Sequence, residues 1–99
     1  MEEKYKQLLK VSNPEEVNER SLLYYDRPIQ LSTRKNKKYM IVDDWGKLRH
    51  FGDIHYEDAT YHKNIERVIR YRKRMMNVKG NWRSDEFSPN NSSLRILWA

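Results

Sequence analysis

The stretch PIQLSTRKNKKYMIVDDWGKLRHF, residues 28–51, decides the fold, because its apolar side chains tend to recur at every second position. In YMIV, residues 39–42, the first and third side chains would point to one face of a strand and the second and fourth to the other. The basic run RKNKK and the turn DDWG separate three such segments. The pattern therefore predicts a three-stranded antiparallel meander over about residues 29–34, 38–43 and 47–51.

Two short helices are expected before this sheet. Three apolar residues share one face of a helix expected over residues 2–11: Tyr5, Leu8 and Leu9. A second helix should begin at SNPEEV, because Asn13 can cap its first turn and Pro14 suits the first helical position. It should end before Pro28, since the residue preceding a proline avoids helical geometry. Residues 1–28 are thus predicted to form an N-terminal helical extension.

A long basic helix is expected after the sheet, over about residues 60–78, with Asp58 or Thr60 as its cap. It should pack on the sheet through an apolar stripe with one amphipathic edge, composed of Ile65, Val68, Ile69, Arg72 and Met76. Its other face carries four cations spaced by four, three and four residues: Lys63, Arg67, Arg70 and Arg74.

The C-terminal stretch SPNNSSLRILWA favours a last short helix, with Ser88 as its cap and Pro89 at its first position. Leu94, Leu97 and Trp98 would then share a face. A strand is the alternative, because Leu94, Ile96 and Trp98 also alternate. The predicted fold class is α+β, with a small domain over residues 29–99 that consists of the meander, the long basic helix and this apolar helix.

Positive charge is concentrated in two parts of the chain, whose formal net charge is +6. Residues 60–79 contain seven basic residues and one acidic residue, whereas residues 43–58 are acidic. The loop between the first two strands adds a second cluster: Arg34, Lys35, Lys37 and Lys38. A polarised surface suits an anionic partner, either nucleic-acid phosphates or an acidic protein surface. The eight cations of the helix face and the loop are the predicted anion-binding residues, and since no sequence-reading motif is visible, any nucleic-acid binding should be sequence-blind.

Catalysis and metal binding find little support in the sequence. The absence of cysteine excludes disulfides, thiolate zinc sites and cysteine nucleophiles. His50, His55 and His62 stand among carboxylates, yet their spacing matches no closed zinc pattern. They remain the candidates for a small metal-dependent nuclease, which is the third functional hypothesis. We expect no enzymatic activity, cofactor, metal or small-molecule substrate.

Several stretches, taken together and in order, resemble a family of small uncharacterised basic proteins of large double-stranded DNA viruses of the nucleocytoplasmic group, with relatives in some tailed phages. These stretches are LSTRKNKKYMI, GKLRHFGD, YEDATYHKNIERVIRYRKR, GNW and SPNNSSLRILW. Asn64 departs from the family pattern, which usually has Asp, and residues 1–28 lie outside the resemblance. The resemblance implies a viral origin but no reaction, so no catalytic residue is carried over.

A structural, virion-associated role follows as the first expectation: a minor capsid or internal virion protein, made in the host cytoplasm, that binds other virion proteins and possibly DNA. A sequence-nonspecific nucleic-acid-binding protein acting during infection is the alternative. Six apolar residues near the chain ends are predicted to dock on other chains: Tyr5, Leu8, Leu9, Leu94, Leu97 and Trp98. No apolar run approaches the ~20 residues of a membrane span, so no membrane span is expected.

Overall fold

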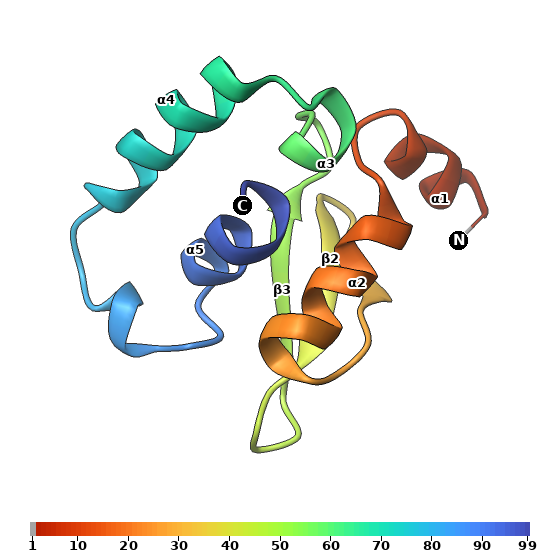
Figure 1. Cartoon of the computed structure of the whole chain (residues 1–99). Coiled ribbons are helices and arrows are strands. Elements are labelled where there is room, and N and C mark those ends of the chain that lie inside the picture. The colour runs from red at the N-terminus through yellow and green to blue at the C-terminus, as the bar shows by residue number, and fades with distance from the viewer. Residues whose placement is uncertain (1) are drawn as a thin grey trace.

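Three antiparallel strands form the centre of the structure, a computed structural model that describes residues 2–99 and, of their side chains, those from Glu3 onward (Figure 1). The strands are β1 (Gln30–Leu31), β2 (Lys37–Val42) and β3 (Leu48–Asp53), in the order β1-β2-β3. With the five α-helices, this confirms the α+β class and the meander. The first strand is shorter than predicted, because the Ser32 hydroxyl accepts the Arg34 amide at 3.0 Å and turns the chain.

The pleat of the sheet follows the alternation in the sequence. Tyr39, Ile41 and Phe51 are buried on one face. Val42 and Leu48 pair with each other on the other face and are partly exposed. Burial of one face fixes the register, because a shift by one residue would expose the whole apolar set.

The N-terminal helices form where they were predicted, although the first ends two residues earlier, and they are part of the domain. They are α1 (Glu2–Leu9) and α2 (Pro14–Tyr25). The Asn13 side chain accepts the Glu16 amide, and α2 stops at Asp26, whose φ is 57°. Leu8, Val17 and Tyr25 belong to the same hydrophobic core as the sheet. Residues 1–28 are therefore not a separate extension as far as the structure describes them.

The C-terminal chain is helical, and the strand alternative is wrong. After the 3-10 turn η1 (Trp82–Ser84), α5 (Pro89–Ser92) continues into the π-helical turn η2 (Ser93–Leu97). As predicted, the Ser88 hydroxyl caps this helix, accepting the Asn91 amide at 3.2 Å. The helix packs beside α2 over the sheet (Figure 1). It thereby occupies the place that we expected the long basic helix to fill.

The predicted helix over residues 60–78 is broken into α3 (Ala59–His62) and α4 (Ile65–Met76). Between them Lys63 takes a left-handed conformation, with φ 55°, and Asn64 caps the second helix by accepting the Arg67 amide. The predicted buried stripe is wrong for most of its apolar residues: Ile65 is 73% exposed and Ile69 is 61% exposed, whereas Val68 is half-buried against the core. Figure 1 shows α4 standing off from the body of the molecule. None of the helices within residues 2–99 has the length and apolar character needed to cross a membrane.

Candidate anion-binding cleft

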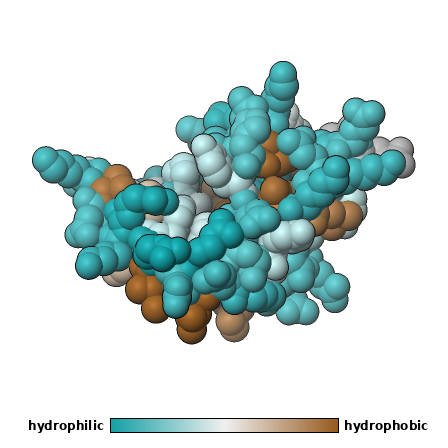
Figure 2. Space-filling view, turned by 90° about the horizontal axis from the view of Figure 1, so that it is seen from above, coloured by the Kyte–Doolittle hydropathy of each residue, from teal (hydrophilic) through white to brown (hydrophobic). Residues whose placement is uncertain are grey.

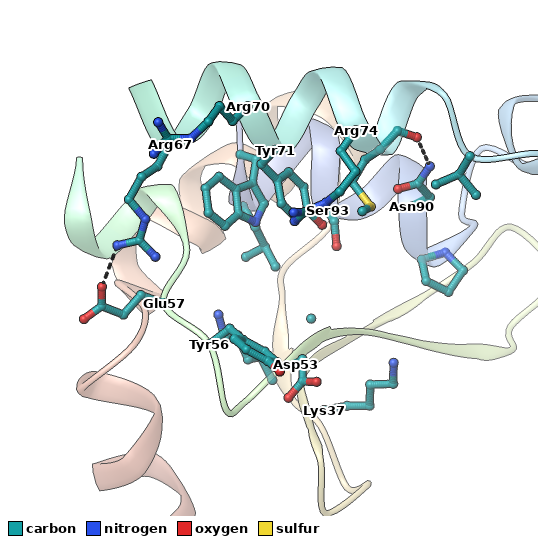
Figure 3. A pocket seen from close by; sticks show the side chains of 17 residues that line it. Lys37, Asp53, Tyr56, Glu57, Arg67, Arg70, Tyr71, Arg74, Asn90 and Ser93 are labelled. Atoms are coloured by element: carbon teal, nitrogen blue, oxygen red, sulfur yellow. Dashed lines mark hydrogen bonds and ion pairs between the residues drawn. The ribbon is translucent and has the colours of Figure 1, made fainter. Parts of the chain in front are cut away.

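A cleft of about 600 Å³ lies between α4 and the facing end of the sheet, and residues of the C-terminal helix also line it (Figure 3). We call it the basic cleft. Its lining includes the cations Lys37, Lys38, Arg67, Arg70 and Arg74, and the carboxylates Asp53 and Glu57. Its apolar and aromatic lining comprises Tyr56, Tyr71, Met75, Val78, Leu97 and Trp98.

The attachment of α4 to the body determines the shape of the basic cleft. The rings of Tyr71 and Trp98 stack with centroids 4.1 Å apart and planes 11° apart. The Arg72 guanidinium donates to the Leu94 carbonyl at 2.7 Å and to the Trp98 carbonyl at 3.0 Å. Near the other end of α4, the Asn90 amide donates to the Met75 carbonyl at 2.9 Å. These contacts hold α4 along one line and leave its arginine-bearing side facing the cleft.

Only part of the positive charge in the basic cleft is neutralised by the protein. The Arg67 guanidinium lies 2.9 Å from Glu57. For Lys37, Arg70 and Arg74, no ion pair forms with any carboxylate among the side chains of residues 3–99. The Arg74 guanidinium instead lies 5.6 Å from the Tyr71 ring centre, in cation–π geometry. These three cations form no ion pair within the protein and can therefore bind an external anion.

Tyr56 lies on the wall opposite α4, next to Asp53 (Figure 3). Its side chain is 68% exposed although it lines the cleft. Asp53 itself bonds to the His55 ring at 2.7 Å, and it is also the cross-strand partner of Lys37, whose charge helps to lower the pKa of Asp53. The mouth of the cleft thus combines one exposed aromatic ring with unpaired cations.

Lys38 was predicted to be a surface cation, and that prediction is wrong. Its side chain is 2% exposed, and its ammonium lies 2.9 Å from Asp58, which is 1% exposed. Burial lowers the pKa of Lys38, and the Asp58 carboxylate opposes that effect. The aliphatic part of Lys38 packs near Gly52, and both residues line the cleft.

A chain of hydrogen bonds extends from this buried ion pair. Asp58 accepts the amide and the hydroxyl of Thr60, as expected for the predicted cap of α3. The Thr60 oxygen in turn lies 3.2 Å from Ser12, and Ser12 lies 2.7 Å from the Tyr39 hydroxyl. Because the Thr60 proton goes to Asp58, the consistent direction is Tyr39 to Ser12 to Thr60. The histidine-carboxylate stretch therefore includes a joint that ties the sheet to α3 and to the loop after α1.

The remaining predicted cations lie outside the basic cleft. Lys63 is not part of α4, and its ammonium lies 2.6 Å from Glu16 of α2. Arg34 and Lys35 are exposed in the β1–β2 loop and do not line the cleft. The predicted strip of four cations on one helix is thus wrong: one belongs elsewhere, one is paired, and Arg70 and Arg74 remain.

Most of the predicted docking residues are core residues. Leu8, Leu94, Leu97 and Trp98 are all less than 10% exposed, so the prediction that they form an exposed surface is wrong. Tyr5 and Leu9 of α1 are 46% and 45% exposed. Figure 2 shows a largely hydrophilic surface in which hydrophobic residues gather in separate patches. Exposed apolar groups elsewhere include Leu23, Trp45 and Ile65.

The three histidines lie in three different hydrogen-bonding environments. His50 bonds to Ser32 at 2.7 Å, and His55 bonds to Asp53. The His62 Nδ1 accepts the Asn64 amide at 2.9 Å, and burial lowers the pKa of His62, helped by the charge of Arg67. Within the described part of the chain, no three His, Asp or Glu side chains converge as a metal site would require.

Sequence reasoning missed the aromatic part of the cleft. Tyr56 stands in a short connection, where its only signal is an aromatic residue in a polar loop. Tyr71 and Trp98 are 27 positions apart in the sequence, and their stacking depends on how α4 crosses the C-terminal helix. No local pattern encodes that crossing.

In comparisons with known proteins, part of the chain matches one protein family. No curated protein and no solved structure matches it. Residues 28–75 match a family described as a family of unknown function (DUF5754). The match covers the three strands, α3 and α4 except its last residue, and so includes both walls of the basic cleft but not Trp98. Over this segment the chain is similar to a family to which no activity is assigned.

Proposed function

We propose that this protein is a non-enzymatic binding protein that attaches to an anionic macromolecule through the basic cleft. One observation carries the proposal: Lys37 on one wall and Arg70 and Arg74 on the other line a common space, and none of the three forms an ion pair with a carboxylate among the side chains of residues 3–99. Uncompensated like charges repel one another, and a bound anion relieves that repulsion. A concave site also focuses the field of its charges, which favours capture of an anion.

The biological setting that we propose is a virion, in which the protein is a minor capsid or internal structural component. This part of the proposal is supported by the resemblance of five sequence stretches to small basic proteins of large DNA viruses. Mass spectrometry of purified particles from the source virus tests it. Recovery of the protein in particles at a constant ratio to the major capsid protein is expected, and absence from particles would refute the virion role while leaving the cleft untouched.

Salt-dependent binding tests the role of the basic cleft. We expect the purified protein to bind heparin, a flexible polyanion, with an affinity that falls steeply as salt rises. The double substitution Arg70→Gln/Arg74→Gln should weaken binding and reduce the slope of log affinity against log salt by about two units, if each arginine contacts one anionic group.

The matched control is Arg34→Gln/Lys35→Gln, which removes the same charge from a loop outside the basic cleft. This control should leave the slope nearly unchanged. Equal effects of the two double variants would mean that net charge, and not the cleft, governs binding. Thermal unfolding of each variant checks that it is folded, which we expect because all four side chains are exposed.

Sequence-nonspecific nucleic-acid binding is the second candidate function. The observation that favours it is the exposed Tyr56 ring beside the unpaired cations, since aromatic rings bind unpaired bases in a sequence-tolerant way.

A further inference from the structure

The apolar part of the lining, which we call the floor of the basic cleft, limits the kind of anion that fits. It consists of Tyr71 and Trp98, whose rings stack, and of Leu97, Met75 and Val78. Leu97 and Trp98 are less than 10% exposed, so the part of the floor that still reaches solvent comes from Tyr71, Met75 and Val78. A ligand composed only of charged groups would leave that part in water. A ligand with a planar, weakly polar part would cover it and would gain free energy from burial and ring contacts.

The two walls of the basic cleft offer different chemistry. Arg70 and Arg74 lie on the α4 wall and present guanidinium groups, which suit phosphate oxygens. Tyr56 lies on the opposite wall and presents a ring that is 68% exposed (Figure 3). Lys37, at the start of β2, places one more cation on that same wall. Groups that bind phosphate therefore lie across the cleft from a ring that can stack on a base.

We propose that the basic cleft holds an unpaired nucleotide of single-stranded nucleic acid. This inference rests on the proposed function and names the chemistry of its partner. The base stacks on Tyr56 and covers the apolar floor, while the adjoining phosphates lie between Arg70, Arg74 and Lys37. A duplex does not fit this arrangement, because its bases expose no ring faces to a side-on cleft.

Charge also favours a nucleotide over an acidic peptide. The cleft already contains two carboxylates, Asp53 and Glu57, and the latter is paired with Arg67. The carboxylates of an acidic peptide carry their charge on flexible side chains and bring no planar group to cover Tyr56 or the floor. A phosphodiester instead offers single charges at a regular spacing, separated by planar groups that match Tyr56 and the floor.

Fluorescence anisotropy of a labelled oligothymidylate tests this inference on the full chain. Competitors are inorganic polyphosphate, a polyglutamate peptide and a blunt DNA duplex, each at matched charge. We expect the oligothymidylate to bind more tightly than all three competitors. Tyr56→Ala should weaken oligothymidylate binding about tenfold and leave polyphosphate binding unchanged, whereas Arg70→Gln/Arg74→Gln should weaken both.

Tyr24→Ala is the matched control, because Tyr24 is also exposed but lies on α2 outside the basic cleft. It should bind the oligothymidylate as the wild type does. A photo-crosslink from 5-iodouracil in the oligonucleotide, mapped by mass spectrometry, should fall on the peptide that contains Tyr56.

The outcomes separate this inference from the proposed function. If polyphosphate or polyglutamate binds as tightly as the oligothymidylate, and only the arginine variants matter, the nucleotide inference fails and the anion-binding function stands. Equal binding of duplex and single strand also overturns the nucleotide inference. If no polyanion binds, both proposals fail.

Discussion

Helices α2 and α4 have the same length and the same kind of cap, yet they pack in opposite ways. Each has 12 residues, and each begins after an asparagine whose side chain accepts a backbone amide in the first turn. Helix α2 buries Val17, Ser21 and Tyr25, whereas α4 has no buried residue. The apolar and charged residues are the more sharply segregated in α4, which is nevertheless the more exposed helix.

The difference teaches that an amphipathic pattern does not determine which face of a helix makes contact. Helix α4 touches the body through Tyr71, beside its basic face, and through Val68 and Arg72 of the predicted stripe. Trp98 offers a flat ring to the tyrosine, and the end of the C-terminal helix offers carbonyls to the arginine. The contact was determined by the partner surface, and Ile65, Ile69 and Met76 of the apolar stripe remained exposed.

The largest expected effect sharpens the comparison directly. Tyr25→Ala should lower the free energy of unfolding by about 4 kcal/mol, because Tyr25 is 4% exposed, stacks on Phe87 and donates to the Glu86 carbonyl. Ile69→Ala, the counterpart on α4, should lower it by less than about 0.5 kcal/mol. Urea unfolding followed by circular dichroism measures both. A large loss for Ile69→Ala would show that α4 is packed in solution in a way the structure does not contain.

A second pair of variants extends the comparison to ion pairs, one buried between β2 and the cap of α3 and one exposed on α4. Lys38→Met should lower the free energy of unfolding by about 3 kcal/mol, because it leaves the Asp58 carboxylate buried without its cation. Arg67→Met, which breaks a half-exposed pair with Glu57, should cost less than about 1 kcal/mol.

The double variant Lys38→Met/Asp58→Asn isolates the buried charge as the cause. The amide oxygen introduced by Asp58→Asn can still accept a hydrogen bond from Thr60. The double variant should therefore be more stable than the single variant Lys38→Met. Equal or lower stability of the double variant would mean that the lysine contributes mainly by packing.

Local sequence patterns predicted most of the helices and strands, whereas long-range contacts determined which of their side chains are buried or line the cleft. Alternation gave the three strands, and the pairs Asn13-Pro14 and Ser88-Pro89 correctly indicated where two helices begin. The burial of Lys38 depends on Asp58, 20 positions later, and no periodicity reports it. The break before α4 depends on the left-handed Lys63 and on the Asn64 cap. Asn64 favours the start of a new helix, but the residues around it also fit one continuous helical pattern, so the break was not predicted. Of the predicted anion-binding residues, those in the basic cleft could be chosen only after the helix positions were known.

A smaller effect is expected when α4 loses its anchor. Tyr71→Ala should lower the global free energy of unfolding by about 1 to 2 kcal/mol, because it removes the stack on Trp98. Its main result should be local: amides of α4 should exchange with solvent much faster, while those of α2 keep their protection. Hydrogen exchange with mass spectrometry measures both segments in one experiment. Uniform loss of protection in the two helices would show that α4 and α2 unfold as one cooperative unit.

The smallest expected effect is a pH dependence at the junction between α3 and α4. Burial lowers the pKa of His62, its Nε2 atom is buried without a hydrogen-bond partner among the described residues, and its Nδ1 must stay unprotonated to accept the Asn64 amide. The unfolded chain therefore binds a proton more readily than the folded one. Stability from this group is fully present above the ordinary histidine pKa of about 6.5 and falls as pH drops toward the lowered folded pKa.

We expect the free energy of unfolding to fall by less than about 1 kcal/mol over that range. Amide exchange should become faster at the start of α4 and should not change in α2. The pKa of His50 is lowered as well, first by burial and then by Arg34, so the wild-type profile contains both histidines. The variant His62→Gln retains His50, and subtracting its profile from that of the wild type isolates His62. A flat difference would mean that the imidazole already reaches water, and that the α3–α4 junction is more open than its hydrogen bonds indicate.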